Sequence, residues 1–451
     1  MTKSAIVAGA LSLALASTVH GQRTAGGSAG RVAAVDEYMG PLLELQVFSG
    51  TLLVARGDTI ALERSYGLAD VEQHVSFTDS TVFRIASISK SFTRALLGRL
   101  SDQGRLSVDD RLSRWLPKLP SSDRITLRML LDHRSGIKHV NSLPYDEEAI
   151  ESNSLKRLVD SIARLPLDFE PGTARRYSNG GYAVLARVIE LAAGDVFGAV
   201  LEREILTPLQ LSQTAHEADG TIVRHAARGY MPSPEIAGRL VRAPFQEMDT
   251  KTGGGSMVSS ARDLVKWMRA IGRSEILREA TWADLFPRKD SVFAFDGRAP
   301  GFNVFVSHDR KRDATTVVLA NNYSAGMVGD VAVAAEAIAL GSSPKALPVE
   351  PPAESPNSQL RSLVGRYGIP DGALPVPPGS AVDLKLVNGH LVVCLGPTPV
   401  DVLVPQQNGT FLARTLWSMV EPGAKTGDIA NSITVRALYR DHSFSAARVT
   451  K

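Results

Sequence analysis

The sequence predicts a two-lobed α+β fold, in which an antiparallel sheet flanked by helices adjoins an all-helical lobe and a small all-β C-terminal domain follows. Residues 49–67 and 302–321 carry the short apolar runs of strands, whereas the segment between them has the apolar periodicity of helices. Five prolines gather in residues 342–358, which indicates a boundary. Alternating apolar runs follow residue 359 and predict strands.

The elements of the first 341 residues follow from this periodicity. A helix at 35–48 is expected to lead into strands at 49–54 and 59–67, with a turn at 56–58. Helices are expected in the middle of the chain at residues 89–103, 109–115, 127–131, 153–163, 180–193, 198–204 and 259–271. Strands at 302–307 and 314–321 and a helix at 326–340 complete this part. A site is expected at the interface of the two lobes, where ligand clefts form preferentially.

The C-terminal quarter of the chain is predicted to form a separate domain. The proline-rich segment 342–358 is expected to be a stiff, extended linker between a main domain at 31–341 and a β-domain at 359–451. Strands of that domain are predicted at 381–387, 390–395, 400–404 and 433–439. Cys394, the only cysteine, lies in one of these apolar runs and is expected to be a buried thiol.

The N-terminus has the pattern of an export signal. Lys3 provides a positive start, residues 5–19 form an apolar core, and small residues before Gln22 allow cleavage after residue 21. This predicts a periplasmic or secreted protein with no membrane span after processing, and an uncleaved, tethered form is the alternative.

Composition and motif spacing exclude several classes of function. The net charge of +3 is small for 451 residues, and no basic run of the kind that binds nucleic acid is present. The nine histidines are scattered without metal-ligand spacing, and the glycine run at 253–255 lacks the pattern of a phosphate loop. No cofactor, metal or nucleic-acid partner is therefore expected.

Ser87 and Lys90 form a Ser-x-x-Lys motif at the start of an apolar helical run. Residues three apart lie on one face of a helix, so the lysine can reach the serine hydroxyl. A serine becomes nucleophilic when a neighbouring base removes its proton, and a buried lysine can be that base. Residues 342–345 fit the same pattern but lie among prolines, so context decides between the two.

Tyr177 and Asn179 form the only Tyr-x-Asn sequence in the chain. A phenol near a lysine can serve as a general base, and an amide two residues on can donate to a substrate carbonyl. A turn with a core tyrosine is the alternative interpretation. Together with the upstream Ser-x-x-Lys motif, the pair favours catalysis.

At these residues the sequence resembles the serine β-lactamase and penicillin-binding-protein-like family, specifically its class C β-lactamase, esterase and D-aminopeptidase group. Further segments carry the resemblance in the expected order, at residues 48–54, 125–137, 169–182 and 254–264. The resemblance implies a β-lactamase-like fold and an acyl-enzyme on Ser87, with Lys90 and Tyr177 sharing the proton transfers and Asn179 orienting the substrate. It also places His133 away from the nucleophile. Residues 360–367 resemble the opening of the small β-barrel domain that is appended to many of these hydrolases.

The family's third motif, a Lys-Thr-Gly or His-x-Gly on an inner strand, is altered in this chain. Lys251-Thr252-Gly253 and Lys425-Thr426-Gly427 fit it literally, but the first leads into a helix and the second lies in the C-terminal region. Residues 294–302 align better with the family segment. Phe295 then takes the cationic position. Gly297 has no side chain and lets the backbone lie close to the substrate. The Arg298 N–H joins the Ser87 N–H as an oxyanion hole.

These expectations describe an exported serine hydrolase that cleaves a β-lactam, a D-amino-acid peptide or an ester. The altered third motif casts more doubt on β-lactam hydrolysis than on hydrolysis in general. The alternative from another class is a catalytically silent module that binds peptidoglycan or a protein on the same fold.

Overall fold

The computed structural model describes residues 29–140, 155–218, 222–233, 239–286, 291–323, 326–374, 376, 378–438 and 442–449. The predicted export signal at 1–21 lies outside these residues. No helix in the described part of the chain is long and apolar enough to cross a bilayer.

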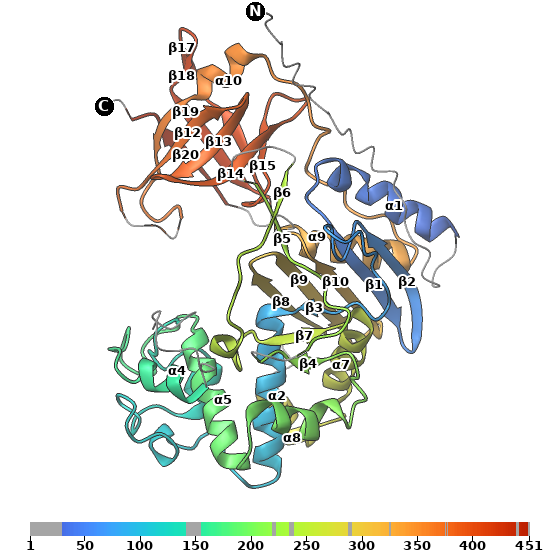
Figure 1. Cartoon of the computed structure of the whole chain (residues 1–451), viewed down its shortest axis with the longest axis vertical. Coiled ribbons are helices and arrows are strands. Elements are labelled where there is room, and N and C mark those ends of the chain that lie inside the picture. The colour runs from blue at the N-terminus through green and yellow to red at the C-terminus, as the bar shows by residue number, and fades with distance from the viewer. Residues whose placement is uncertain are drawn as a thin grey trace, which may run out of the picture.

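A five-stranded antiparallel sheet forms the centre of the main domain (Figure 1). Its strand order is β2-β1-β10-β9-β8, with β1 at Gly50–Arg56, β2 at Thr59–Tyr66, β8 at Val292–Ala299, β9 at Phe302–Asp309 and β10 at Ala314–Ala320. β1 from the N-terminal part pairs with β10, so that Gly50 lies opposite Ala320. The two ends of the domain therefore build one sheet, as predicted, and β8 is left as an edge strand.

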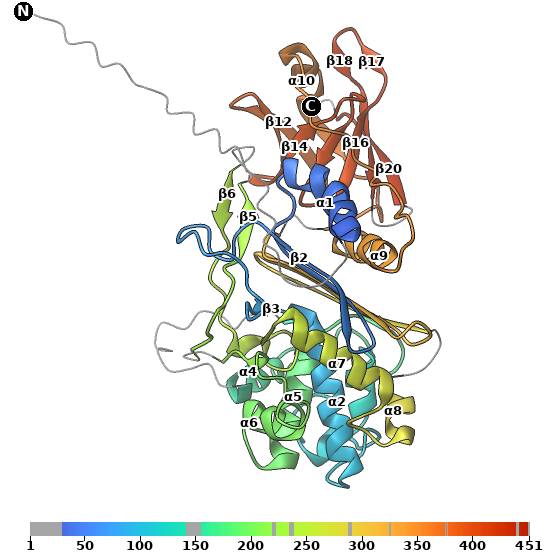
Figure 2. The same cartoon turned by 90° about the vertical axis from the view of Figure 1, so that its right-hand side faces the viewer.

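Helices cover both faces of this sheet, because successive side chains of a strand point to opposite faces. Leu52 and Val54 of β1 pack with α1 (Ala29–Glu44) and α9 (Val328–Ala339). Leu53 and Ala55 point to the other face and join the core that holds α2 (Ser89–Asp102), α7 (Ala261–Arg273) and α8 (Glu279–Leu285). Figure 2 shows the sheet between these two helical layers.

The helical lobe extends that second core. It comprises α3 (Leu127–Leu131), α4 (Leu155–Ile162), α5 (Asn179–Ala193), α6 (Phe197–Leu201) and a π-helical turn η3 (Glu202–Leu206). The helix expected at 109–115 is only a short 3₁₀ turn, η2 (Leu112–Arg114), because the Leu112 N–H bonds to Ile125 O across the loop instead of continuing a helix. Smaller pairings connect β3 (Phe83–Arg84), β7 (Met257–Ser259) and β4 (Ala215–His216), and β5 (Tyr230–Pro232) with β6 (Leu240–Arg242).

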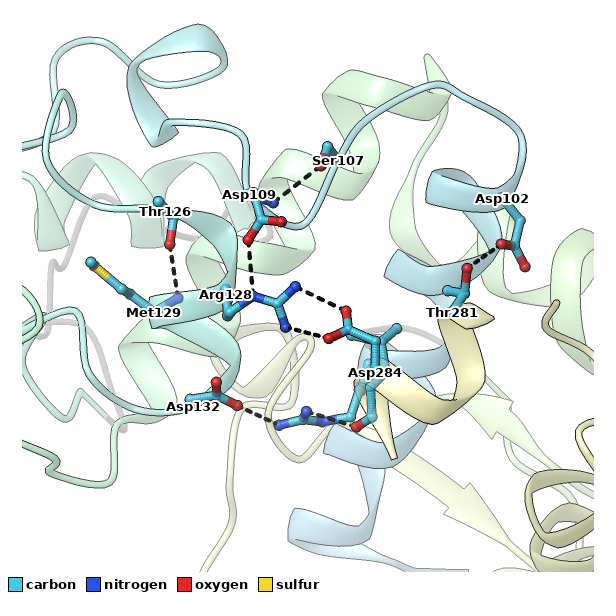
Figure 3. Close-up of polar contacts among 11 residues, drawn as sticks. Asp102, Ser107, Asp109, Thr126, Arg128, Met129, Asp132, Thr281 and Asp284 are labelled. Carbon is cyan, nitrogen blue, oxygen red and sulfur yellow. Dashed lines mark hydrogen bonds and ion pairs between the residues drawn. The ribbon is translucent and has the colours of Figure 1, made fainter. Parts of the chain in front are cut away.

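Polar contacts join α8 to the helical lobe (Figure 3). The Arg128 guanidinium on α3 donates two hydrogen bonds to the Asp284 carboxylate at 2.9 and 3.0 Å and a third to Asp109. Thr281 on α8 donates to Asp102 at the end of α2. Two paired oxygens on a planar guanidinium fix orientation as well as distance, so α8 is held in register with α3.

The C-terminal domain is an eight-stranded antiparallel sheet that nearly closes on itself. α10 (Asn357–Leu363) precedes strands in the order β11-β12-β13-β14-β15-β16-β19-β20. These strands lie at Gly365–Gly368, Ala381–Val387, His390–Leu395, Thr398–Pro405, Phe411–Ala413, Ser418–Pro422, Ser432–Ala437 and His442–Ala447, and a small hairpin adds β17 (Lys425–Thr426) and β18 (Ile429–Ala430). Tyr367 on β11 bridges to Arg448 just beyond β20, so the first and last strands meet. β12 and β13 coincide with the predicted strands, and Cys394 is buried.

Trp417 attaches this barrel-like domain to the main domain. It is 1% exposed and packs, with Leu412 and Met419, into the core formed by α1 and α9. A Cβ on Gly326 would lie 2.7 Å from the Trp417 Cβ, so only a glycine allows the indole this close to the backbone that precedes α9.

We therefore expect Trp417→Ala to lower the free energy of unfolding by about 3–5 kcal/mol, because removal of a buried tryptophan leaves a cavity. The midpoint of urea unfolding, followed by circular dichroism, measures this change. Leu416→Ala is the matched control, since Leu416 is 47% exposed. Equal midpoints for the two variants would contradict the role of Trp417.

Candidate active site

Ser87 lies at a sharp turn immediately before a helix. It belongs to a 3₁₀ turn, η1 (Ala86–Ile88), which continues directly into α2. The preceding Ala86 has a φ of +45°, a left-handed conformation that is uncommon outside glycine. Such local strain collects at functional sites. The turn places Ser87 at the N-terminal end of the 14-residue helix α2, where the helix dipole stabilises developing negative charge.

Lys90, in the first turn of α2, donates hydrogen bonds to three groups of the site. Its ammonium donates to Gly254 O at 2.6 Å, to Asn179 Oδ1 at 2.7 Å and to Ser87 Oγ at 3.2 Å. Burial lowers the pKa of Lys90 to about 7, although the nearby Asp296 carboxylate acts in the opposite direction. The lysine can therefore lose its proton near neutral pH, which an exposed lysine cannot do.

Tyr177 meets Ser87 from the helical lobe. Its hydroxyl lies 2.6 Å from Ser87 Oγ, and the Lys90 Nζ is 4.8 Å from the centroid of its ring. Burial raises the pKa of Tyr177, and the hydrogen bond to Ser87 acts against this rise. The phenol is therefore protonated at neutral pH and can donate a hydrogen bond.

His133 supports the ring of Tyr177. The two ring centroids are 4.7 Å apart, and His133 Nδ1 accepts a hydrogen bond from the Ser178 N–H at 3.2 Å. Burial lowers the pKa of His133 to about 4, and the charge of Lys90 adds to the decrease, so the imidazole is neutral. These contacts are with Tyr177 and its neighbour Ser178, as a structural imidazole would make them, although they bring His133 closer to the site than expected. The contacts are those of a positioning residue.

Asn179 reaches the site because α5 begins there. Ser178 is the N-cap of α5, and its hydroxyl accepts from the Gly181 N–H and donates to Lys138 O. Asn179 is thus the first helical residue, and its Oδ1 binds Lys90. His139 Nδ1 accepts a hydrogen bond from the Asn179 N–H at 3.3 Å.

The edge strand β8 lies against the Ser87 turn, and Gly297 is the point of contact. A Cβ on Gly297 would lie 2.4 Å from Ile85 O and 3.0 Å from the Ser87 N, so any other residue would push the strand away. Phe295, two residues earlier, packs against the main core. Phe295, the residue aligned from the sequence with the cationic position of the family segment, therefore brings no charge to the cleft.

The Arg298 side chain turns toward the C-terminal domain. Its guanidinium donates to Thr415 O at 2.9 Å and lies 4.3 Å from the ring centroid of Tyr323. Lys251, in a 3₁₀ turn η4 (Asp249–Lys251), does line the same cleft as Ser87, whereas Lys425 lies on β17 of the barrel-like domain. Of the two literal Lys-Thr-Gly sequences, only the first therefore approaches the site, and it does so from a turn.

A cleft of about 540 Å³ brings these groups together between the lobes. Four of the six predicted site residues line it, namely Ser87, Tyr177, Asn179 and Arg298, whereas Lys90 lies behind Ser87 and Gly297 lies at the edge of its turn. Within the described residues no group of three His, Cys, Asp or Glu could hold a metal ion.

Three residues of the cleft were missed by the sequence reasoning. Asp296, between Phe295 and Gly297 in the sequence, lines the cleft. Its negative charge favours the protonated forms of Lys90 and Tyr177, and so partly offsets the effect of burial on the pKa of Lys90. Gly254 supplies the carbonyl that binds Lys90, and His139 lies beside Tyr177. The run of three glycines at 253–255 was the available signal, because it marks a place where backbone approaches another group closely.

Several known proteins are similar to this chain. The family model Beta-lactamase matches residues 32–306. Penicillin-binding protein 4* of Bacillus subtilis is 24% identical over 444 residues, which cover 90% of this chain and 96% of the relative. Teichoic acid D-alanine hydrolase of Staphylococcus aureus is 28% identical over 238 residues, and that match covers 52% of this chain and 56% of the relative. The crystal structure of SurE has a TM-score of 0.59 at 22% identity and covers 93% of this chain and 99% of that one.

The burial of Lys90 predicts a lysine that titrates with a pKa of about 7. Methylene signals of ¹³C-labelled lysines, followed by NMR from pH 5 to 11 in folded protein, should show one resonance with this midpoint. Lys90→Met should remove that resonance, and Lys266→Met, at an exposed position, should not. If every lysine titrates above pH 9, the ammonium is not desolvated as the contacts require.

Proposed function

The chain belongs to the beta-lactamase family, and from this premise we propose that it is an exported serine hydrolase that works through an acyl-enzyme on Ser87. The observation that carries the proposal is the convergence of Lys90 and Tyr177 on one hydroxyl, at 3.2 and 2.6 Å. These distances are within reach of direct proton transfer.

Lys90 acts as the base in this proposal. A neutral amine has two N–H donors and one lone pair, and the two shorter contacts of Lys90, to Gly254 O and Asn179 Oδ1, use both donors. The lone pair then faces the Ser87 hydroxyl and accepts its proton while Oγ bonds to the substrate carbonyl carbon. Tyr177 is the less available base, because its raised pKa keeps the phenol protonated at neutral pH.

Tyr177 delivers the proton that the leaving group needs. When the carbonyl re-forms, the bond to the leaving oxygen or nitrogen breaks, and that atom takes the phenolic proton. The Lys90 ammonium then restores the phenol with the proton that it took from Ser87, so one proton leaves with the first product and Lys90 is neutral again. Water then attacks the ester, gives its proton to the same pair of groups, and releases Ser87.

The Ser87 N–H and the Arg298 N–H are the proposed oxyanion hole. The close approach of Gly297 to the Ser87 N holds the edge of β8 next to the serine. Two fixed N–H donors on a developing oxyanion lower the barrier without reorganisation. The Asn179 carboxamide, whose oxygen binds Lys90, presents its NH₂ group as the donor to the acyl side of the substrate.

D-Amino-acid esters and amides are the substrate class that the cleft favours. Lys251 lines the cleft from η4, and the Arg298 guanidinium is turned toward Thr415. With Phe295 in the core, the charge that β8 itself brings to the cleft is therefore the negative one of Asp296. That charge attracts a free ammonium group and opposes the carboxylate of a β-lactam. The name of one relative, a teichoic acid D-alanine hydrolase, supports a D-alanine derivative as the substrate.

We place the catalytic domain at 31–341, the linker at 342–358 and the β-domain at 359–451. Residues 1–21 are proposed to direct export, with cleavage before Gln22, which would bring the enzyme to periplasmic or extracellular substrates.

Ser87→Ala should abolish covalent labelling by a fluorophosphonate while leaving the thermal midpoint unchanged. The wild-type protein should gain one adduct in intact-mass spectra, located on Ser87. Tyr177→Phe should label and turn over about 10²–10⁴ times more slowly, because a positioned proton donor is lost. A well-folded wild-type protein without an adduct would instead indicate a catalytically silent binding module.

Asp296→Asn should reduce kcat/KM for D-alanine p-nitroanilide by about tenfold, because a charge pair worth ~1.4 kcal/mol is lost. The N-acetylated substrate, which lacks the ammonium, should respond little, and a chromogenic cephalosporin should be hydrolysed better by the variant. Asp313→Asn, in a distant turn, is the control substitution. An equal effect on both anilides would show that Asp296 does not recognise an ammonium.

A further inference from the structure

The barrel-like C-terminal domain holds a partly open apolar cavity at one end of its packed core. The cavity has a volume of about 410 Å³ and is lined almost wholly by apolar side chains from several strands, such as Val382, Leu384, Val393 and Val435. Eight strands are enough to hold one small ligand. An apolar lining favours apolar occupants.

One end of the cavity faces the main domain. Met231 of β5 and Tyr323, which follows β10, line it together with Thr415 and Leu416 of the barrel. Figure 1 shows the β5–β6 hairpin reaching the base of the barrel. The cavity is therefore completed by both domains, and its occupant would lie at their junction.

A single buried carboxylate orders the rim. Asp401 is 1% exposed and accepts hydrogen bonds from the N–H groups of Thr415 and Leu416, at 2.8 and 3.3 Å. These bonds direct the Thr415 carbonyl toward Arg298, which donates to it. The same arginine lines the Ser87 cleft, and its guanidinium contacts Thr415 and Tyr323, two residues that line the apolar cavity.

We propose that this cavity binds one aliphatic chain whose carboxylate meets Arg298 at the mouth. The lining selects an alkyl group, since it offers almost no polar partner. The volume accommodates about a dozen groups of ~30 Å³, the share of a water and close to that of a methylene. The guanidinium matches a carboxylate in charge and in planar geometry. The proposal concerns binding alone and does not depend on Ser87 acting as a nucleophile.

Titration calorimetry of the full chain with dodecanoate tests this site. The Ser87→Ala variant should bind one molecule with the same Kd as the wild type, which separates binding from turnover. Val382→Phe and, independently, Val435→Phe fill the cavity and should weaken binding at least tenfold. Lys385→Phe places the same ring on the exposed side of β12 and should leave the Kd unchanged. Arg298→Gln should weaken dodecanoate severalfold but not dodecanol, because only the carboxylate uses the charge.

Two results would overturn the proposal. One is the absence of saturable dodecanoate binding to well-folded wild-type protein. The other is binding that both cavity-filling variants retain with unchanged thermal midpoints, which would place the ligand on the outer surface. If one filling variant fails to fold, the other decides, since the two substitutions lie on different strands, β12 and β19.

Discussion

The desolvated ammonium of Lys90 is the contact on which the active-site architecture depends. Its acceptors come from three segments, the Ser87 turn, the start of α5 and the glycine run at 253–255, so one side chain ties the sheet lobe to the helical lobe. A buried charge is tolerated only where its donors are satisfied. The burial that lowers the pKa of Lys90 therefore also requires the surrounding backbone to keep its position.

The supporting features divide between chain geometry and side-chain chemistry. The left-handed Ala86 and the glycine at 297 let two backbones meet beside Ser87, and the Ser178 cap fixes where α5 begins. His133 and His139 flank the ring of Tyr177 without charge of their own, because burial lowers the pKa of both. Neutral rings hold the phenol while adding little to the positive potential around Lys90.

Sequence patterns predicted the fold class and four residues that line the cleft, because both depend on local signals. Strands β1, β9 and β10 of the central sheet are short apolar runs, and the Ser-x-x-Lys spacing is set by one helical turn. Contacts that depend on tertiary approach were not predictable. The hydrogen bond between Ser178 and His133, which brings His133 next to Tyr177, joins residues that are 45 positions apart in the sequence. The hydrogen bond between Lys90 and Gly254 joins residues that are 164 positions apart, so sequence spacing could predict neither contact. The helix expected at 109–115 is absent because the Leu112 N–H donates its hydrogen bond to Ile125 O across the loop and not to a carbonyl within a helix.

Through the hydrogen bond from Arg298 to Thr415, the C-terminal domain keeps the positive charge of this arginine turned toward itself. A chain cut before the linker would retain Ser87, Lys90 and Tyr177, yet its Arg298 would have neither the carbonyl nor the domain that draws it aside. The freed guanidinium could then lie beside Asp296 and neutralise it. Measurements on residues 31–341 alone would therefore describe a cleft with a different electrostatic environment.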